Sequence, residues 1–192
     1  MQDPRLTPTS HIVLGLLELA GEATPYALKQ LVRDSVGNFW SLQHAQLYTE
    51  PERLTKAGYL RERREEDGRR RKRYSLTLQG REALRRWRSE PTSELYELRD
   101  PGLLQLFFGA DPAALASVQI AVHRAKLEQF EKLLESDPGT GDRGPWLTLQ
   151  AGVRVEREII RFWEALLDPT APSSPPRSRD DRRTRRSRGR RS

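Results

Sequence analysis

The sequence predicts a mainly α-helical chain with one small β-hairpin, and two observations support this fold class. A helix-like run at residues 41–58 leads directly into two strand-like runs, residues 59–63 and 72–76. Farther along, residues 112–135 and 146–167 each have the apolar spacing of a long helix, separated by a short polar connection. We therefore expect a winged helix-turn-helix domain with a β-hairpin wing, followed by a C-terminal antiparallel helical dimerisation domain.

The composition excludes several classes of protein. The chain has 192 residues and no cysteine, which excludes a disulfide framework, a thiol nucleophile and a cysteine-ligated metal. No apolar run approaches the roughly 20 residues that a membrane span requires, and the polar start lacks the apolar segment of a signal peptide. We expect a cytoplasmic protein without membrane contact.

The positive charge is concentrated in two places. The net charge is +7, and residues 169–192 account for all of it with nine arginines and two aspartates. A second basic cluster lies between Arg61 and Arg73, where eight basic residues accompany four acidic ones. Because a nucleic-acid footprint is a local basic patch, this second cluster is more informative than the net charge.

The first helix is predicted from an apolar run at residues 12–20. Thr9 or Ser10 supplies its N-terminal cap, and Gly21 ends it. Its apolar residues are expected to lie in the core, which is where such side chains usually pack.

The second helix begins at the pair Thr24-Pro25, which are the favoured residues for an N-cap and a first helical position. Four residues are expected on its inner face: Tyr26, Leu28, Leu31 and Val32. On the outer face, Lys29 either contacts a DNA phosphate or is ordinary solvated surface. The aromatic pair Phe39-Trp40 follows and either fills a gap between helices, meets a partner subunit or stacks on a ligand.

The run at residues 41–58 is the predicted recognition helix. Leu47, Leu54 and Ala57 form one apolar stripe, and Gly58 ends the helix. The polar residues on its other faces are candidates for DNA contacts: Gln43, His44, Gln46, Tyr48, Arg53 and Lys56. The glutamines can pair bidentately with adenine, and the histidine can donate to a base or a phosphate.

Three assignments in this helix stay open. Tyr48 either contacts a phosphate or packs under the wing, and Arg53 either contacts a phosphate or pairs with a glutamate at position 50 or 52. Pro51 occupies an apolar position, and a proline inside a helix costs about 3 kcal/mol unless the backbone adapts, so we expect a kink. Alternatively, Thr49 and Glu52 form a capping box and a new helix begins at residue 50.

The wing is predicted from the two strand-like runs around an Asp67-Gly68 turn. Its tip is strongly basic and contains four further candidates for DNA contact: Arg69, Arg70, Arg71 and Lys72. These side chains can reach phosphates or a narrow minor groove. The alternative is a solvated charged turn that the neighbouring acidic residues balance.

The C-terminal part is predicted from caps and apolar faces. Thr77 caps a helix with Leu84 and Trp87 on its inner face, and prolines follow the aspartates at 100 and 111, where two further helices begin. The long helix that ends near residue 135 presents an apolar face formed by Leu115, Val118, Val122 and Ala125, then Leu127, Phe130 and Leu134. The last helix presents Leu149, Val153, Ile160, Trp163 and Leu167 on one side, with Val155, Ile159, Phe162 and Leu166 beside them. One hairpin cannot bury both faces, which favours a two-fold homodimer.

Several spaced motifs resemble the PadR family of bacterial transcriptional regulators. They are Leu14-Gly15-Leu16-Leu17, Phe39-Trp40-Ser41, Gln46-Leu47-Tyr48, Arg53-Leu54, Ala57-Gly58-Tyr59-Leu60, Gly68-Arg69-Arg70-Arg71-Lys72, Leu76-Thr77-Leu78-Gln79-Gly80, Leu98-Arg99-Asp100-Pro101 and Leu106-Phe107-Phe108-Gly109. The resemblance covers roughly residues 9 to 167 and includes the longer members of the family, whose second, helical domain dimerises. The chain departs from the family pattern at Pro51, because the family usually has its proline directly after Leu-Tyr.

The resemblance implies a dimeric repressor that binds an inverted-repeat operator in double-stranded DNA and responds to a small-molecule inducer or a partner protein. We expect residues 1–90 to bind DNA, residues 91–168 to dimerise and residues 169–192 to form a disordered tail. A ligand pocket at the dimer interface would use the following side chains: Trp40, Trp146 and Trp163.

Two other functions stay open: sequence-nonspecific binding of nucleic acid through the Arg-rich tail, and a helical dimerisation adaptor. Catalysis is not expected. His11, His44 and His123 are scattered, and there is no nucleophile motif, phosphate loop, metal spacing or cofactor signature.

Overall fold

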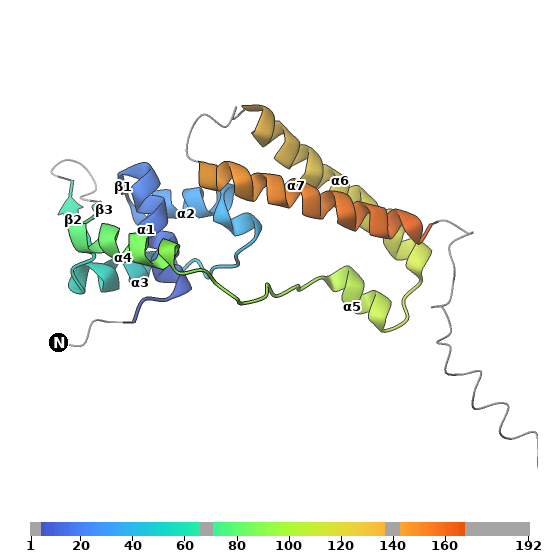
Figure 1. The fold of residues 1–192 in the computed structure, drawn as a ribbon, viewed down its shortest axis with the longest axis horizontal. Helices are drawn as coiled ribbons and strands as arrows, with labels where there is room; N and C mark the ends of the chain where they lie inside the picture. Colours follow the sequence, from blue (N-terminus) through green and yellow to red (C-terminus); the bar gives the residue numbers. More distant parts are fainter. Residues whose placement is uncertain (1–4, 66–70, 137–142, 168–192) are drawn as a thin grey trace, which may run out of the picture. The chain divides into compact units, whose positions relative to one another are not determined.

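The computed structural model describes residues 5–65, 71–136 and 143–167. They belong to two compact units, which divide between Tyr96 and Glu97 (Figure 1). We call residues up to Tyr96 the N-terminal unit and residues from Glu97 the C-terminal unit. None of the described helices is both long and apolar enough to cross a membrane.

The N-terminal unit packs helices against a small antiparallel sheet (Figure 1). Its elements are α1 (Pro8–Ala20), β1 (Glu22–Ala23), α2 (Pro25–Asp34), the short 3₁₀ helix η1 (Val36–Asn38), α3 (Gln46–Lys56), β2 (Leu60–Arg64), β3 (Lys72–Leu76) and α4 (Leu78–Ser89). The strand order is β1-β3-β2, and Leu60 pairs with Leu76 across the hairpin. The two predicted strands of the hairpin are confirmed, with β2 one residue later than expected, and the predicted Asp67-Gly68 turn lies outside the described residues. The sequence analysis missed β1, because two residues are too few for a strand pattern.

The helix ends follow the expected chemistry at most positions. Thr24 and Thr77 cap α2 and α4, and Gly21 and Gly58 have the positive φ angles, 73° and 82°, that suit glycine at a helix end. The expected start of α1 was wrong. Thr7 is the cap, because its side chain accepts a hydrogen bond from the backbone N–H of residue 10 and Pro8 takes the first helical position.

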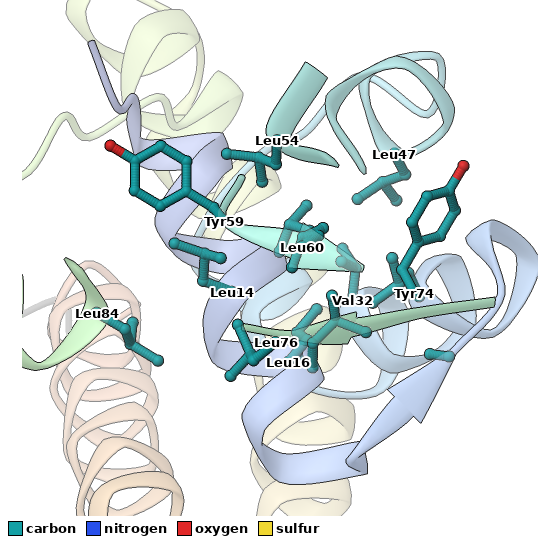
Figure 2. Close-up of a cluster of buried hydrophobic side chains, with 14 residues drawn as sticks. Leu14, Leu16, Val32, Leu47, Leu54, Tyr59, Leu60, Tyr74, Leu76 and Leu84 are labelled. Atoms are coloured by element: carbon teal, nitrogen blue, oxygen red, sulfur yellow. The ribbon is translucent and has the colours of Figure 1, made fainter. Parts of the chain in front are cut away.

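The core of the N-terminal unit lies between α1, α3, α4 and the hairpin. Figure 2 shows Leu14 of α1, Leu47 and Leu54 of α3, and Leu60 and Tyr74 of the hairpin among its buried side chains. This apolar cluster holds α3 and the wing on one rigid support.

Two residues expected inside are exposed. Tyr26 is 62% exposed on α2 and Trp87 is 48% exposed on α4. The Trp87 ring stacks on His11 of α1, with ring centroids 4.6 Å apart, so it covers the surface instead of filling the core. Helical spacing predicts which side of a helix faces inward, but residues at the edge of that side can lie on the surface.

The C-terminal unit contains α5 (Pro101–Phe107), α6 (Pro112–Ser136) and α7 (Arg143–Ala165), with α6 and α7 packed as an antiparallel pair (Figure 1). Asp100 caps α5 as expected. Ala116, Ile120 and Phe130 of α6 are buried, whereas Val118 and Val122 of the predicted inner stripe are 60% and 57% exposed. Because α6 carries apolar residues on more than one side, its sequence does not specify which side meets α7. On α7 the predicted residues Val153, Ile160 and Trp163 are buried.

Candidate nucleic-acid interface

Helix α3 begins later than predicted, at Gln46. Gln43 has no regular structure and His44 lies in a turn, so neither belongs to the helix, and both side chains are exposed just before it. The cap position is Ala45, whose side chain makes no capping hydrogen bond. The sequence therefore contained no cap signal that could have located this start.

Helix α3 continues through Pro51, whose ring is buried. The capping-box alternative is wrong, because Thr49 lies inside the helix and its hydroxyl donates to the backbone carbonyl of Ala45 at 3.4 Å. The kink expected at Pro51 stays a prediction.

The exposed face of α3 follows from the 100° step of a helix. Thr49, Glu52 and Lys56 lie at its centre, and Gln46 and Tyr48 lie at its two edges, all exposed. Within the described residues, the side chains of Gln46, Tyr48 and Lys56 make no hydrogen bond or ion pair, so they are free to bind. Thr49 and Glu52 were not among the predicted contacts, because the capping-box hypothesis placed them at a helix start.

Arg53, one of the predicted DNA contacts, is instead used inside the protein. Its guanidinium pairs with Glu50 through two contacts, at 2.6 Å and 2.9 Å, and donates to the fully buried hydroxyl of Ser10 at 2.9 Å. Ser10 in turn donates to the Glu50 carboxylate at 2.6 Å. Burial alone would raise the pKa of Glu50, but the hydrogen bonds from Arg53 and Ser10 bring that pKa below its ordinary value. The pairing alternative is confirmed, and this network fixes α3 to α1.

The basic hairpin is extensively paired with acidic residues on both faces of the sheet. On one face, Glu22 pairs with Arg63 at 2.9 Å and with Arg73 at 3.4 Å. The hydrogen bond from Arg63 lowers the pKa of Glu22 below its ordinary value. On the other face, the Lys72 ammonium lies 2.6 Å from Glu52 of α3, which raises the pKa of Lys72. Lys72 therefore joins the wing to the recognition helix.

Two arginines at the hairpin remain available. Arg61 and Arg71 are exposed, and neither side chain has a partner in the described part of the chain. Arg61 was not among the predicted contacts, although its alternation with Leu60 on β2 could have placed it outside. Arg69 and Arg70 lie outside the described residues. Lys29 on α2 is partly exposed and has no ion pair there, so it stays a candidate.

The three tryptophans predicted to form a ligand pocket do not come together within one chain. Trp163 is fully buried in the C-terminal unit, and Trp146 lies 17 positions earlier on the same helix, about 25 Å away at 1.5 Å per residue. Trp40 belongs to the N-terminal unit and is 44% exposed.

Trp163 does lie beside a cleft in the C-terminal unit. The cleft has a volume of about 280 Å³ and is lined by Leu98, Asp100, Leu103, Glu158, Ile159, Phe162 and Trp163. The buried indole N–H of Trp163 makes no hydrogen bond within the described residues, although such groups usually find an acceptor. The described residues contain no group of three or more His, Asp or Glu placed to hold a metal ion.

Comparison with known proteins supports the interpretation of the fold. Residues 13–86 match the family described as "Transcriptional regulator PadR-like family", and residues 98–168 match the family described as "Virulence activator alpha C-term". The chain is 29% identical to the negative transcriptional regulator PadR of Bacillus subtilis (strain 168), over 82% of this chain and 94% of that protein.

Solved structures share the fold over most of the chain. The crystal structure of Bacillus subtilis PadR in complex with operator DNA superimposes with a TM-score of 0.76 at 24% identity, and covers 85% of this chain and 97% of that one. The structure of the same regulator in complex with p-coumaric acid gives a TM-score of 0.67 at 23% identity, with 85% and 97% covered. The fold is thus a winged helix-turn-helix unit with a C-terminal helical region.

Proposed function

We propose that this chain is a PadR-like transcriptional regulator, since residues 13–86 match that family and the chain is 29% identical to a PadR regulator. It would be a dimeric, ligand-responsive repressor that acts in the cytoplasm on an inverted-repeat operator. The N-terminal unit would bind DNA, and the C-terminal unit would dimerise. The observation that carries this proposal is the exposed face of α3 with its unpaired polar side chains, held beside a basic hairpin on a common core. A helix enters a major groove, and the wing reaches the adjacent backbone.

The proposal divides the candidate contacts by chemistry. Gln46, at the exposed start of α3, would pair bidentately with a base, and Gln43 and His44 lie just before it. Positioning contacts to phosphate would come from Lys29, Tyr48, Lys56 and Arg71, together with Arg69 and Arg70 of the wing tip. We do not include Arg53 in the interface, because its guanidinium already donates hydrogen bonds to Glu50 and Ser10.

Dimerisation is supported by apolar side chains that the C-terminal unit leaves uncovered. Val118 and Val122 of α6, Val155 and Phe162 of α7, and Phe107 of α5 are all between 43% and 82% exposed. Exposed apolar surface of this extent usually marks an interface. In a two-fold dimer, the two recognition helices would meet half-sites one helical turn apart, roughly 34 to 36 Å.

The cleft beside Trp163 supports a small-molecule effector. Its walls are largely apolar side chains, as is usual for small-molecule sites, and Trp163 forms part of them. A relative, the Bacillus subtilis PadR, has been crystallised with p-coumaric acid. An effector could shift the protein between two arrangements only if it bound them with different affinity. Trp40 and Trp146 stay candidates for a separate site in the assembled dimer.

The experiment is a selection from random DNA duplexes, performed with the full chain and with a chain that lacks residues 169–192. A dimeric operator-binding regulator enriches a palindrome with both chains, and loss of the tail weakens binding modestly and in a salt-dependent way. If binding is lost with the tail and no sequence is enriched, the protein is a sequence-blind nucleic-acid binder. If a dimer forms but neither chain binds DNA, the protein is a dimerisation adaptor.

A further inference from the structure

Glu52 is an acidic side chain at the centre of the α3 face that we expect to approach DNA. It lies between Thr49 and Lys56 on that face and is 48% exposed. A carboxylate in this place would be repelled by DNA phosphates. A physical role for Glu52 must therefore be found either in the free protein or in the selectivity of binding.

In the free protein, Glu52 holds the first residue of β3. Its Oε1 atom lies 2.6 Å from the Nζ atom of Lys72, and Lys72 also lies 3.4 Å from Glu62. Glu62 is shared with Arg64, at 3.3 Å, and with the hydroxyl of Tyr74, at 3.4 Å. Glu52 is thus the nearest carboxylate to the Lys72 ammonium, and the pair joins α3 to the start of β3, next to the tip of the wing.

We propose that Glu52 restrains sequence-blind DNA binding by holding Lys72, so that Lys72 contacts a phosphate only when this ion pair breaks. The inference rests on the proposed function, since it takes α3 and the wing as the DNA-contacting elements. A lysine already neutralised by a carboxylate gains little by exchanging it for a phosphate, and the exchange leaves Glu52 uncompensated next to DNA. Repulsive elements of this kind lower the affinity for wrong partners.

The test measures binding of the full chain to a random-sequence duplex at salt concentrations from about 50 to 200 mM. The variants are Glu52→Gln, Lys72→Met and the double variant. The matched control is Glu128→Gln, which removes the same charge from a Lys–Glu pair of the same 2.6 Å length on α6. Circular dichroism confirms that each variant is folded.

Glu52→Gln should steepen the slope of log K against log salt by about 0.9 for each DNA-bound subunit, or about 1.8 for the dimer, which corresponds to one added phosphate contact per subunit. The same slope predicts about thirtyfold tighter binding of the dimer at 0.15 M salt, if the two lines converge near 1 M. Lys72→Met should weaken binding of the parent protein, because it leaves Glu52 without its nearest cation, but by less than it weakens binding of the Glu52→Gln variant, where it should remove the whole gain in affinity.

Three results would overturn the inference. In the first, Glu52→Gln has the same affinity and salt slope as Glu128→Gln. In the second, the gain in affinity of Glu52→Gln persists when Lys72 is also replaced. In the third, Lys72→Met lowers the affinity of the parent protein as much as it lowers that of Glu52→Gln. If the parent protein and every variant fail to bind duplex DNA, the proposed function itself is wrong, and this inference fails with it.

Discussion

Arg53 offers the sharpest test of the interface, because its position on the recognition helix and its contacts predict opposite outcomes. Replacing Arg53 with methionine keeps an unbranched apolar stem and removes the guanidinium. If Arg53 braces α3 against α1, the protein should lose stability and keep its DNA contacts. If it contacts a phosphate, the reverse should hold.

The expected loss follows from the groups that Arg53 leaves behind. Glu50 is only 12% exposed on its side chain and would lose both of its contacts with the guanidinium, while the buried Ser10 hydroxyl would lose a donor at 2.9 Å. A partly buried polar group that loses its partner costs about 1 to 3 kcal/mol. We therefore expect the free energy of unfolding to fall by about 2 kcal/mol. Changing Glu50 to glutamine in the same chain should recover part of this loss, because no uncompensated charge then remains.

The assay combines urea unfolding, followed by tryptophan fluorescence, with the salt dependence of binding to a random duplex. Arg71→Met is the matched control, since Arg71 is exposed and its side chain has no partner in the described part of the chain. It should leave the free energy of unfolding within about 0.5 kcal/mol of the parent value and reduce the salt slope by about 0.9 per subunit, or about 1.8 for the dimer. A stable Arg53→Met protein with a slope reduced by the same amount would refute the reasoning.

Three further predictions follow from other contacts. Gly80→Ala should destabilise the protein by about 1 to 3 kcal/mol in urea unfolding, because the added Cβ would lie 2.2 Å from the backbone oxygen of Tyr59. A Cβ added at Gly15 of α1 would meet open space, so Gly15→Ala should instead stabilise the protein by up to about 1 kcal/mol. Equal changes in unfolding free energy for the two variants would contradict this account. The lowered pKa of Glu50 means that its network stabilises fully above the ordinary value of 4.5 and is lost as pH falls through the lower folded value. Glu50→Gln should therefore flatten the fall in unfolding free energy below pH 4.5, and an unchanged acid limb would exclude the network. Val122→Asp should shift the mass measured by light scattering from dimer toward monomer, because Val122 lies on the exposed apolar face of α6. An unchanged dimer mass would exclude this face as the interface.

Local chemistry made much of the N-terminal unit predictable. Side-chain caps at Thr24 and Thr77, a glycine at each of two helix ends and a strand–turn–strand pattern each have one strongly preferred structure. Where the local signal was missing, the prediction failed. No side chain caps α3, so the helix was started too early and was assigned Gln43 and His44.

The candidate site was less predictable, because it depends on which residues pair across elements. Arg53 and Lys72 both lie on elements expected to touch DNA, but Ser10 and Glu50 hold one of them and Glu52 holds the other. Sequence spacing can show a pairing within one helix, such as the pairing of positions 50 and 53. It cannot show a contact between residues 52 and 72, which the fold alone brings together.

The central claim is that α3 reads bases, and the most direct measurement concerns Gln46. Once selection has provided an operator, binding of Gln46→Ala is measured to a set of duplexes that carry each single base substitution. The control is Gln79→Ala, which changes an exposed glutamine on α4 of the same unit. The account predicts a loss of about 1 to 3 kcal/mol on the operator, with preference relaxed at one base position in each half-site. An equal loss on every duplex, or no loss at all, would contradict the claim that this face of α3 reads the sequence.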